Sequence, residues 1–296
     1  MTRRFAALVL LLCCAFGGPA RGAAIPQEIK KVVTFVFLSP DGGRTFTPDG
    51  TGFFVGVKVR TGDFQVFLVT ARHVLKNPRG KYYHRIWIRL NTRDGGSKMI
   101  PLSLTGAGAV HVYEHPTEPS VDLAVIPALP DKSLYDFEFI PDEMLTTKES
   151  FSELHISEGT DVFFSGLFLP FIGQARNYPI TRFGKVAMMP DEKIPWQDGE
   201  GKPLEMADLY LLETQAFAGS SGSPVFFYLG SNRSPGVLPP GSPIIKLAGV
   251  MMGAFKYASP LMTADKANQD VGIAVVVPSY HLHEILFSDP VKSLLK

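Results

Sequence analysis

The sequence predicts an all-β fold of two six-stranded antiparallel β-barrels, followed by a short C-terminal helix. Short β-branched and aromatic runs recur along the chain at intervals of about ten to twenty residues, with turn residues between them. The composition agrees, because 28 glycines, 24 prolines and 22 phenylalanines with only 19% charged residues suit a turn-rich β protein. At 296 residues and 45% hydrophobic content, the chain is long and apolar enough to build a large core.

The expected strands form two groups of six, separated by a connector at residues 129–156. The first group would build a barrel over residues 25–128 and the second a barrel over residues 157–278. The expected strands are Val32–Leu38, Gly52–Val59, Gln65–Thr70, Arg85–Leu90, Met99–Leu104, Val121–Ala128, Asp161–Phe168, Ile180–Met188, Asp208–Glu213, Pro224–Tyr228, Ile244–Met252 and Val271–Val277.

Two helices and two long loops complete this organisation. We expect a short helix at Asp142–Glu153 in the connector, and a C-terminal helix at Tyr280–Phe287 within residues 279–296, with Ser279 as its N-cap. The polar segments Pro190–Lys202 and Gly230–Pro243, which contain glycine and proline, are predicted to be surface loops.

Residues 1–24 have the pattern of a signal peptide. Arg3 and Arg4 precede the unbroken apolar run Phe5–Phe16, and small residues follow it. The run is far shorter than the ~20 residues of a membrane helix, so we expect cleavage and no stable membrane anchor afterwards. The mature protein is therefore expected outside the cytoplasm, in a periplasm or secreted.

Cysteine content and charge exclude several classes of function. Both cysteines, Cys13 and Cys14, lie in the apolar run, so the mature chain would have no disulfide, no cysteine nucleophile and no thiolate metal site. Removing residues 1–24 removes three arginines and no acid, so the mature net charge is (29 − 3) − 28 = −2. A nearly neutral chain does not suggest a nucleic-acid partner. We expect a monomer without a cofactor, and the remaining histidines show no spacing typical of a metal site.

The segment Gly219–Pro224 carries the strongest chemical signal. Ser221 lies between Gly219 and Gly222, and a glycine at 219 leaves space for a substrate carbonyl and permits unusual backbone angles. The N–H groups of Gly219 and Ser221 could point into one small space and form an oxyanion hole. Taken alone, the segment could equally be a Gly/Ser turn between two strands.

A histidine and an aspartate precede this serine in settings that suit acyl transfer. His73 follows the apolar strand ending at Thr70, where a rigid scaffold can present it. Asp122 stands before four apolar residues and is expected to be partly buried, so it needs a partner such as an imidazole N–H. A serine that attacks, an imidazole that accepts its proton and a carboxylate that orients the imidazole form a catalytic triad.

These motifs resemble the chymotrypsin/trypsin-like serine peptidases, and most of all the exported bacterial branch of Deg-type proteases and glutamyl endopeptidases. The resemblance spans about residues 50–278 and includes Gly50–Phe54, Gly249–Gly253 and Gly272–Pro278. It implies that His73 is the general base, Asp122 its orienting acid and Ser221 the nucleophile, and that Gly219 and Ser221 supply the oxyanion N–H groups. The chain departs from the branch at Ser220, where Asp or Asn is common, and no PDZ-type domain is expected.

The resemblance also implies a polypeptide substrate and the position of its specificity pocket. The pocket would lie near Gln215, with walls from Met252, Gly253 and Ala254, and would favour an uncharged residue before the scissile bond. An esterase of the α/β-hydrolase class is rejected, because Pro224–Tyr228 after the serine is strand-like where that fold needs a helix. The remaining alternative is a non-catalytic trypsin-like domain that serves as a protein-binding module.

Overall fold

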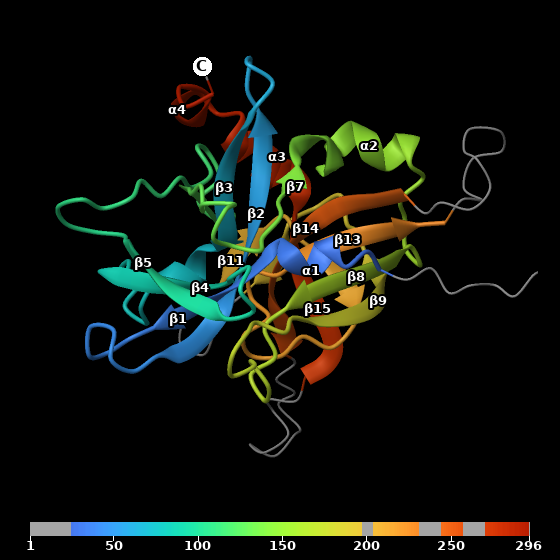
Figure 1. Ribbon diagram of the computed structural model, residues 1–296. Helices are drawn as coiled ribbons and strands as arrows, with labels where there is room; N and C mark the ends of the chain where they lie inside the picture. Colours follow the sequence, from blue (N-terminus) through green and yellow to red (C-terminus); the bar gives the residue numbers. More distant parts are fainter. Residues whose placement is uncertain (1–24, 197–203, 231–243, 257–269, 296) are drawn as a thin grey trace, which may run out of the picture.

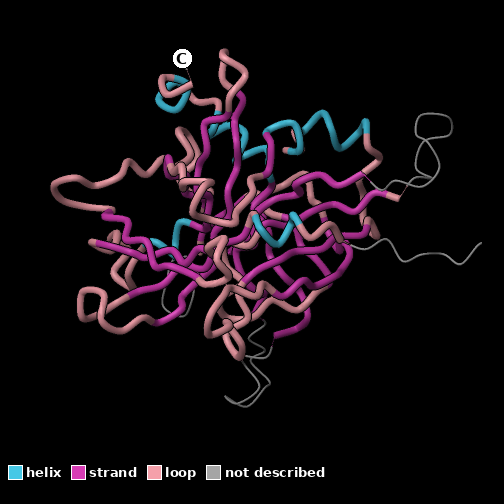
Figure 2. Tube along the Cα trace, viewed as in Figure 1, coloured by secondary structure: helices cyan, strands magenta, loops and turns pink. Residues whose placement is uncertain are grey.

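The computed structural model describes residues 25–196, 204–230, 244–256 and 270–295. Two β units lie side by side, the N-terminal one on the left of Figure 1 and the C-terminal one on the right. Strands dominate both units, and short helices lie at their margins (Figure 2). Within the described ranges, no helix combines the length and the apolar character needed to cross a bilayer.

The N-terminal unit is one antiparallel sheet with the strand order β5-β4-β1-β2-β3-β6, and the short strand β7 pairs with β2 in parallel. All six strands expected here are present, and the sheet is built from the strands β1 (Val33–Leu38), β2 (Thr47–Lys58), β3 (Phe64–Ala71), β4 (Arg85–Asn91), β5 (Ser97–Ser103), β6 (Leu123–Pro127) and β7 (Ile140–Pro141).

This sheet is not closed by hydrogen bonds into the expected barrel, since no pairing among the described residues joins β5 to β6. The long segment between those strands takes the place of a pairing strand. Its Tyr113 exchanges two backbone hydrogen bonds with Val125 of β6, at 2.8 and 2.9 Å. The edge of β6 is thereby covered locally, which avoids a long unpaired strand edge.

The C-terminal unit is a closed six-stranded barrel with the order β12-β15-β14-β13-β8-β9. It confirms the second barrel predicted from the sequence, and its strands are β8 (Asp161–Gly166), β9 (Ile180–Met188), β12 (Tyr210–Glu213), β13 (Pro224–Leu229), β14 (Ile244–Lys256) and β15 (Asp270–Pro278).

One predicted loop contains regular structure. Within Pro190–Lys202, residues Ile194–Trp196 form strand β10, which pairs antiparallel with β11 (Glu205–Ala207). Strand β10 has only three residues, too few for their alternation to predict a strand from the sequence. Pairing with β11 is what stabilises it. Of the second predicted loop, Gly230–Pro243, all but the first residue lies outside the described residues.

Short helices lie at the start of the chain, in the connector and at the end of the chain. Helix α1 (Glu28–Lys31) precedes β1, α2 (Lys148–Glu153) confirms the expected connector helix, and α3 (Ser279–Leu286) and α4 (Asp289–Lys292) follow the last strand. Ser279 is not the N-cap of α3, because Pro278 occupies that position. The Ser279 hydroxyl instead donates to the Thr146 carbonyl oxygen at 2.7 Å, which ties α3 to the connector.

The hydrophobic core runs through both units. Its largest cluster joins Phe35 and Phe53 of the N-terminal sheet to Phe163 and Phe226 of the barrel, and all four side chains are fully buried. Apolar burial of this kind contributes on the order of 25 cal/mol per Å² and fixes the two units against each other. A site assembled from both units can therefore hold a defined geometry.

Candidate active site

His73 is presented by a tight turn at the end of strand β3. The strand ends at Ala71, and residues Arg72–Leu75 form a 3₁₀ turn whose Val74 and Leu75 side chains are buried. These two apolar anchors hold the turn against the sheet and leave the His73 side chain 28% exposed. The turn therefore fixes the backbone of His73 while its ring faces the space between the units.

Asp122 orients the imidazole through both of its carboxylate oxygens. Its Oδ1 accepts the backbone N–H of His73 at 2.9 Å, and its Oδ2 lies 2.5 Å from His73 Nδ1. The Asp122 residue is 5% exposed, and its own carbonyl oxygen accepts the N–H of Arg72 at 3.2 Å. In the neutral ring, this contact places the proton on Nδ1 and leaves Nε2 as the base.

Ser221 belongs to the turn that enters strand β13 of the barrel. Gly222, the next residue, has φ +86°, and a Cβ on it would collide with the carbonyl oxygen of Thr51. Only glycine tolerates both the positive φ and the close approach of the Thr51 carbonyl oxygen. The Ser221 hydroxyl donates to the carbonyl oxygen of Met252 at 3.0 Å. Passing that proton to His73 requires the hydroxyl to turn, and such bonds often align only when substrate is bound.

One cavity of about 520 Å³ is lined by His73, Asp122 and Ser221. The structure thus gathers in one space three residues that stand 49 and 99 positions apart in the sequence. The histidine and the aspartate come from the N-terminal sheet, and the serine comes from the barrel.

Two backbone N–H groups next to the serine are unpaired. Among the described residues, neither the N–H of Gly219 nor that of Ser221 donates to a protein acceptor. Gly219 has φ +91°, and a Cβ there would lie 2.9 Å from the Leu167 side chain, so the position again requires glycine. Two free donors beside a nucleophile can stabilise a negative oxygen that forms during attack.

Thr51 of strand β2 holds the carbonyl side of this loop. Its buried hydroxyl donates to the Gly219 carbonyl oxygen at 2.8 Å and accepts the N–H of Leu167 at 2.9 Å. Its backbone N–H donates to the Ser221 carbonyl oxygen at 2.9 Å. These two carbonyl groups belong to the 219–220 and 221–222 peptides, whose N–H groups donate to the carbonyl oxygens of Phe217 and Met251. Thr51 thus fixes the peptides on either side of the 220–221 peptide, which carries the Ser221 N–H. Sequence reasoning quoted Thr51 only as part of a motif and assigned it no role.

Ser220 orders the same loop from within. It is 3% exposed, and its hydroxyl donates to the Phe217 carbonyl oxygen at 2.5 Å while accepting the Phe217 N–H at 3.1 Å. The backbone N–H and the carbonyl oxygen of Phe217 are thus both hydrogen-bonded to one uncharged side chain. An aspartate here would need a buried cation as its partner, whereas serine needs none.

The residues predicted to form the specificity pocket are spread over the neighbouring surface. Met252 lines the cavity beside Ser221. Gln215 is exposed, and its Oε1 accepts a long hydrogen bond of 3.4 Å from Arg182. Gly253 and Ala254 follow Met252 on β14, where a Cβ on Gly253 would lie 3.9 Å from the ring of Trp196. Trp196 also lines the cavity, and sequence analysis did not single it out.

Comparison with known proteins finds similarity to solved structures. No protein-family model matches the sequence, and no curated protein matches it either. Among solved structures, the Rv3671c protease from M. tuberculosis in its active form is similar, with 17% identity, a TM-score of 0.48, and coverage of 88% of this chain and 81% of that one. Deg5 is similar with 14% identity, a TM-score of 0.44 and 85% of each chain covered.

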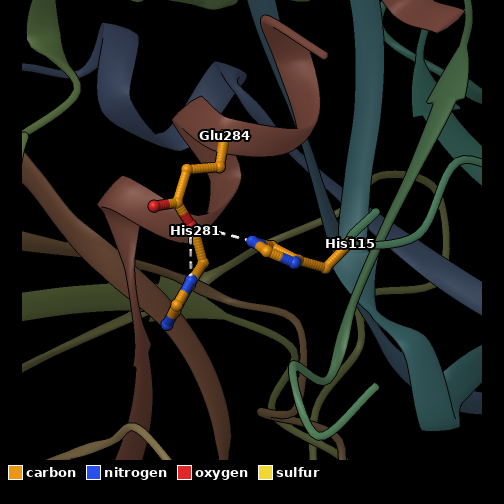
Figure 3. Close-up of side chains that lie close together, drawn as sticks. All are labelled: His115, His281 and Glu284. Carbon is orange, nitrogen blue, oxygen red and sulfur yellow. Dashed lines mark hydrogen bonds and ion pairs between the residues drawn. The ribbon is translucent and has the colours of Figure 1, made fainter. Parts of the chain in front are cut away.

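A second group of polar side chains lies between the loop before Asp122 and helix α3. His115 Nε2 and His281 Nδ1 approach the same oxygen of Glu284, at 2.8 and 2.7 Å (Figure 3). The other ring nitrogen of His281 lies 3.2 Å from an oxygen of Asp208. Sequence spacing could not reveal this group, because His115 and Glu284 are 169 residues apart.

The position of the proton on the His115 ring decides whether this group can bind a metal ion. The three ligand-type atoms lie within 4.8 Å of one another, which would suit a metal ion. However, His115 Nδ1 accepts the backbone N–H of Glu118 at 3.0 Å, so the neutral ring carries its proton on Nε2. That N–H points at Glu284, whereas a metal would need a lone pair there and an N–H on Nδ1. The geometry favours a hydrogen-bonded clamp between the N-terminal unit and α3.

Replacing Thr51 with valine is expected to slow the reaction of Ser221 with a fluorophosphonate by roughly tenfold, less than the ~10²–10³ lost when an oxyanion donor is removed. Valine keeps the volume but removes the hydroxyl bonds to Gly219 and Leu167. Thr51→Ser keeps the hydroxyl and should react nearly as fast as the unaltered protein. Stopped-time labelling of folded protein measures both. Equal slowing by valine and serine would show that Thr51 acts through packing alone.

Replacing Glu284 with glutamine should lower the Tm at pH 7 by roughly 2–4 °C. Burial alone would raise the pKa of the Glu284 carboxyl, but the hydrogen bonds from His115 and His281 outweigh it and keep the pKa below its usual value. A lowered carboxyl pKa gives stability that is present above about pH 4.5 and is lost as the pH falls further.

The difference in Tm between the two proteins should therefore vanish at acid pH. Thermal unfolding from pH 3.5 to 8 measures it, with Glu153→Gln at an exposed position of α2 as the matched control. A difference in Tm that stays constant from pH 3.5 to 8 would rule out a stabilising role for the charged Glu284 carboxylate.

Proposed function

We propose that the protein is an exported serine endopeptidase that cleaves peptide bonds through His73, Asp122 and Ser221. The observation that carries the proposal is the cavity lined by both Ser221 and the carboxylate-oriented imidazole of His73, with the unpaired N–H groups of Gly219 and Ser221 in the loop that carries the serine. Each of these parts serves a different step of acyl transfer, and the arrangement supplies all of them.

The reaction begins with the attack of Ser221 Oγ on the scissile carbonyl carbon. His73 Nε2 accepts the hydroxyl proton, and the carbonyl oxygen becomes an oxyanion that the N–H groups of Gly219 and Ser221 stabilise. His73 then donates that proton to the leaving amine, and the C–N bond breaks. The products are a free amine and an ester between the substrate acyl group and Ser221.

Water completes the cycle through the same groups. His73 accepts a proton from a water molecule, whose oxygen attacks the ester carbonyl carbon. Collapse of the second oxyanion intermediate breaks the ester bond, returns the proton to Ser221 Oγ and releases a carboxylic acid. Asp122, which keeps the imidazole in its orientation, stabilises the imidazolium formed in both halves of the reaction.

Export is supported by the sequence of residues 1–24 and not by the described structure, which begins at Ile25. The Ser221 hydroxyl donates to Met252 in this structure, and this is the feature that would suit a non-catalytic binding module. Covalent labelling distinguishes the two functions, since a binding module would not react with a phosphonate at Ser221.

Ser221→Ala is expected to abolish peptide hydrolysis, with a loss on the order of 10⁶ in turnover, while the circular dichroism spectrum stays unchanged. His73→Ala should cost about as much, and the double variant little more, because the members of a triad act as one unit. Hydrolysis of casein and phosphonate labelling measure the effect. Substantial activity in either folded single variant would contradict the triad.

Activity is expected to rise with pH through the titration of His73. The ring must be neutral to accept the Ser221 proton, and an ordinary histidine titrates near pH ~6.5. The carboxylate of Asp122 favours the charged ring, so the midpoint should lie above that value and activity should be lost as the pH falls through it. The pH dependence of kcat/KM measures this. A profile that is flat between about pH 5.5 and 8 would contradict a histidine base.

A further inference from the structure

The cavity around Ser221 has two sides that differ in origin. Residues 72–83 and Asp49 of the N-terminal unit form the side that carries His73, and Trp196, Glu205 and Met252 form the other. His73 gives its proton to the leaving amine, so the departing part of a peptide must lie on the His73 side. The side chains of that wall meet the residues that follow the scissile bond.

An irregularity in the pairing of β1 with β2 directs Asp49 into the His73 side of the cavity. In the pairing of β1 with β2, Val36 is opposite Gly50 and Phe37 is opposite Pro48, which leaves Asp49 as an extra residue without a partner. Such a β-bulge redirects a side chain, and bulges are frequent beside active sites. Here the redirected side chain is a carboxylate that lines the catalytic cavity.

The carboxylate of Asp49 has no protein partner among the described residues, which include every other residue lining the cavity. The two cations of the same wall are already engaged: Arg72 binds Glu114 at 2.9 Å, and Lys76 binds Glu114 at 3.1 Å. Desolvation in the cavity raises the pKa of the Asp49 carboxyl, and the nearby charge of His73 opposes that rise. Asp49 is exposed at the cavity wall and lies close enough to His73 for the two charges to interact.

The opposite side of the cavity adds to the negative potential. Glu205 of strand β11 lines it and, within the described part of the chain, forms no ion pair. Asp49 and Glu205 are therefore two carboxylates of the cavity lining that form no ion pair among the described residues, whereas Asp122 pairs with His73 and the cations Arg72 and Lys76 share Glu114. A carboxylate without an ion pair attracts a cationic group of a substrate.

We propose that Asp49 is a specificity residue that selects a lysine or arginine side chain just after the scissile bond, so that the substrates are basic polypeptide segments. This inference rests on the proposed peptidase function. It concerns the leaving side of the substrate and is independent of the uncharged residue expected before the bond. An ammonium or guanidinium beside Asp49 would pair with a carboxylate that forms no ion pair with any other described residue.

The test begins with a peptide library derived from a proteome, digested by the purified protein and read by mass spectrometry. Lysine and arginine should be enriched at the first or second position after the cleaved bond. Quenched peptides that differ only in Lys or Gln at the enriched position then give the preference as a ratio of kcat/KM. We expect a ratio of roughly three to ten, because a partly exposed ion pair is worth little more. Raised salt should shrink it.

Variants of Asp49 separate selection from other roles. Asp49→Asn should bring the Lys/Gln ratio close to one by slowing only the lysine peptide, and Asp49→Lys should favour a peptide with Glu at that position. Glu205→Gln, which removes a carboxylate from the opposite side, should change the ratio much less than Asp49→Asn does, because Glu205 adds to the general potential without facing the residue after the bond. Circular dichroism and phosphonate labelling confirm that each variant is folded.

Each contrary result has a distinct meaning. Cleavage without any enrichment of basic residues after the bond would overturn the inference and leave the peptidase function standing. Equal slowing of the lysine and glutamine peptides by Asp49→Asn would also overturn it and would show that Asp49 acts on His73. Absence of both labelling and cleavage in the unaltered protein would overturn the peptidase function, and the inference with it.

Discussion

The site depends above all on the contact of Thr51 with the loop that carries Ser221. The hydroxyl of Thr51 bridges Gly219 and Leu167, and its backbone N–H holds the Ser221 carbonyl oxygen. Gly222 packs directly under the Thr51 carbonyl oxygen, where any side chain would collide. One residue of the N-terminal sheet thus fixes the 219–220 and 221–222 peptides, which flank the 220–221 peptide that carries the Ser221 N–H. Because these bonds cross between the units, the conformation of the Ser221 loop depends on the docking of the units.

Several independent contacts keep the units docked, and this explains how a two-unit site can be rigid. The shared aromatic core is the largest of them. The buried guanidinium of Arg89 adds hydrogen bonds to the Gly173 carbonyl oxygen at 3.1 Å and to Asn177 at 2.5 Å, which tie β4 to the loop after β8. The clamp at Glu284 fixes the segment that leads into Asp122. His73 and Asp122 are thus held by the N-terminal unit and Ser221 by the barrel, so that a shift between the units would alter the distances from Ser221 to both of them.

Local sequence signals were sufficient for the expected strands and for the three residues that line the cavity, but not for what joins them. All twelve expected strands are present and follow from β-branched and aromatic runs, and His73, Asp122 and Ser221 stand in motifs that single them out locally. The unclosed edge beside Tyr113, the β10–β11 hairpin and the role of Ser279 depend on partners far away in the chain. The same holds for Thr51 and for the cluster at Glu284, since a threonine or a histidine has no local feature that names its distant partner.

In the proposed reaction, each developing charge would lie near groups that stabilise it. The imidazolium formed on His73 would lie beside the carboxylate of Asp122 and in the field of Asp49. The oxyanion would be stabilised by the unpaired N–H groups of Gly219 and Ser221. Arg72 and Lys76 lie on the same wall as the base, where Glu114 binds both, and the hydroxyl of Tyr82 donates to the same carboxylate. One carboxylate offsets one of these two positive charges, and Arg72 also lies 4.0 Å from Asp122 Oδ1. Glu114 therefore weakens the repulsion between these cations and the imidazolium without belonging to the three proposed catalytic residues.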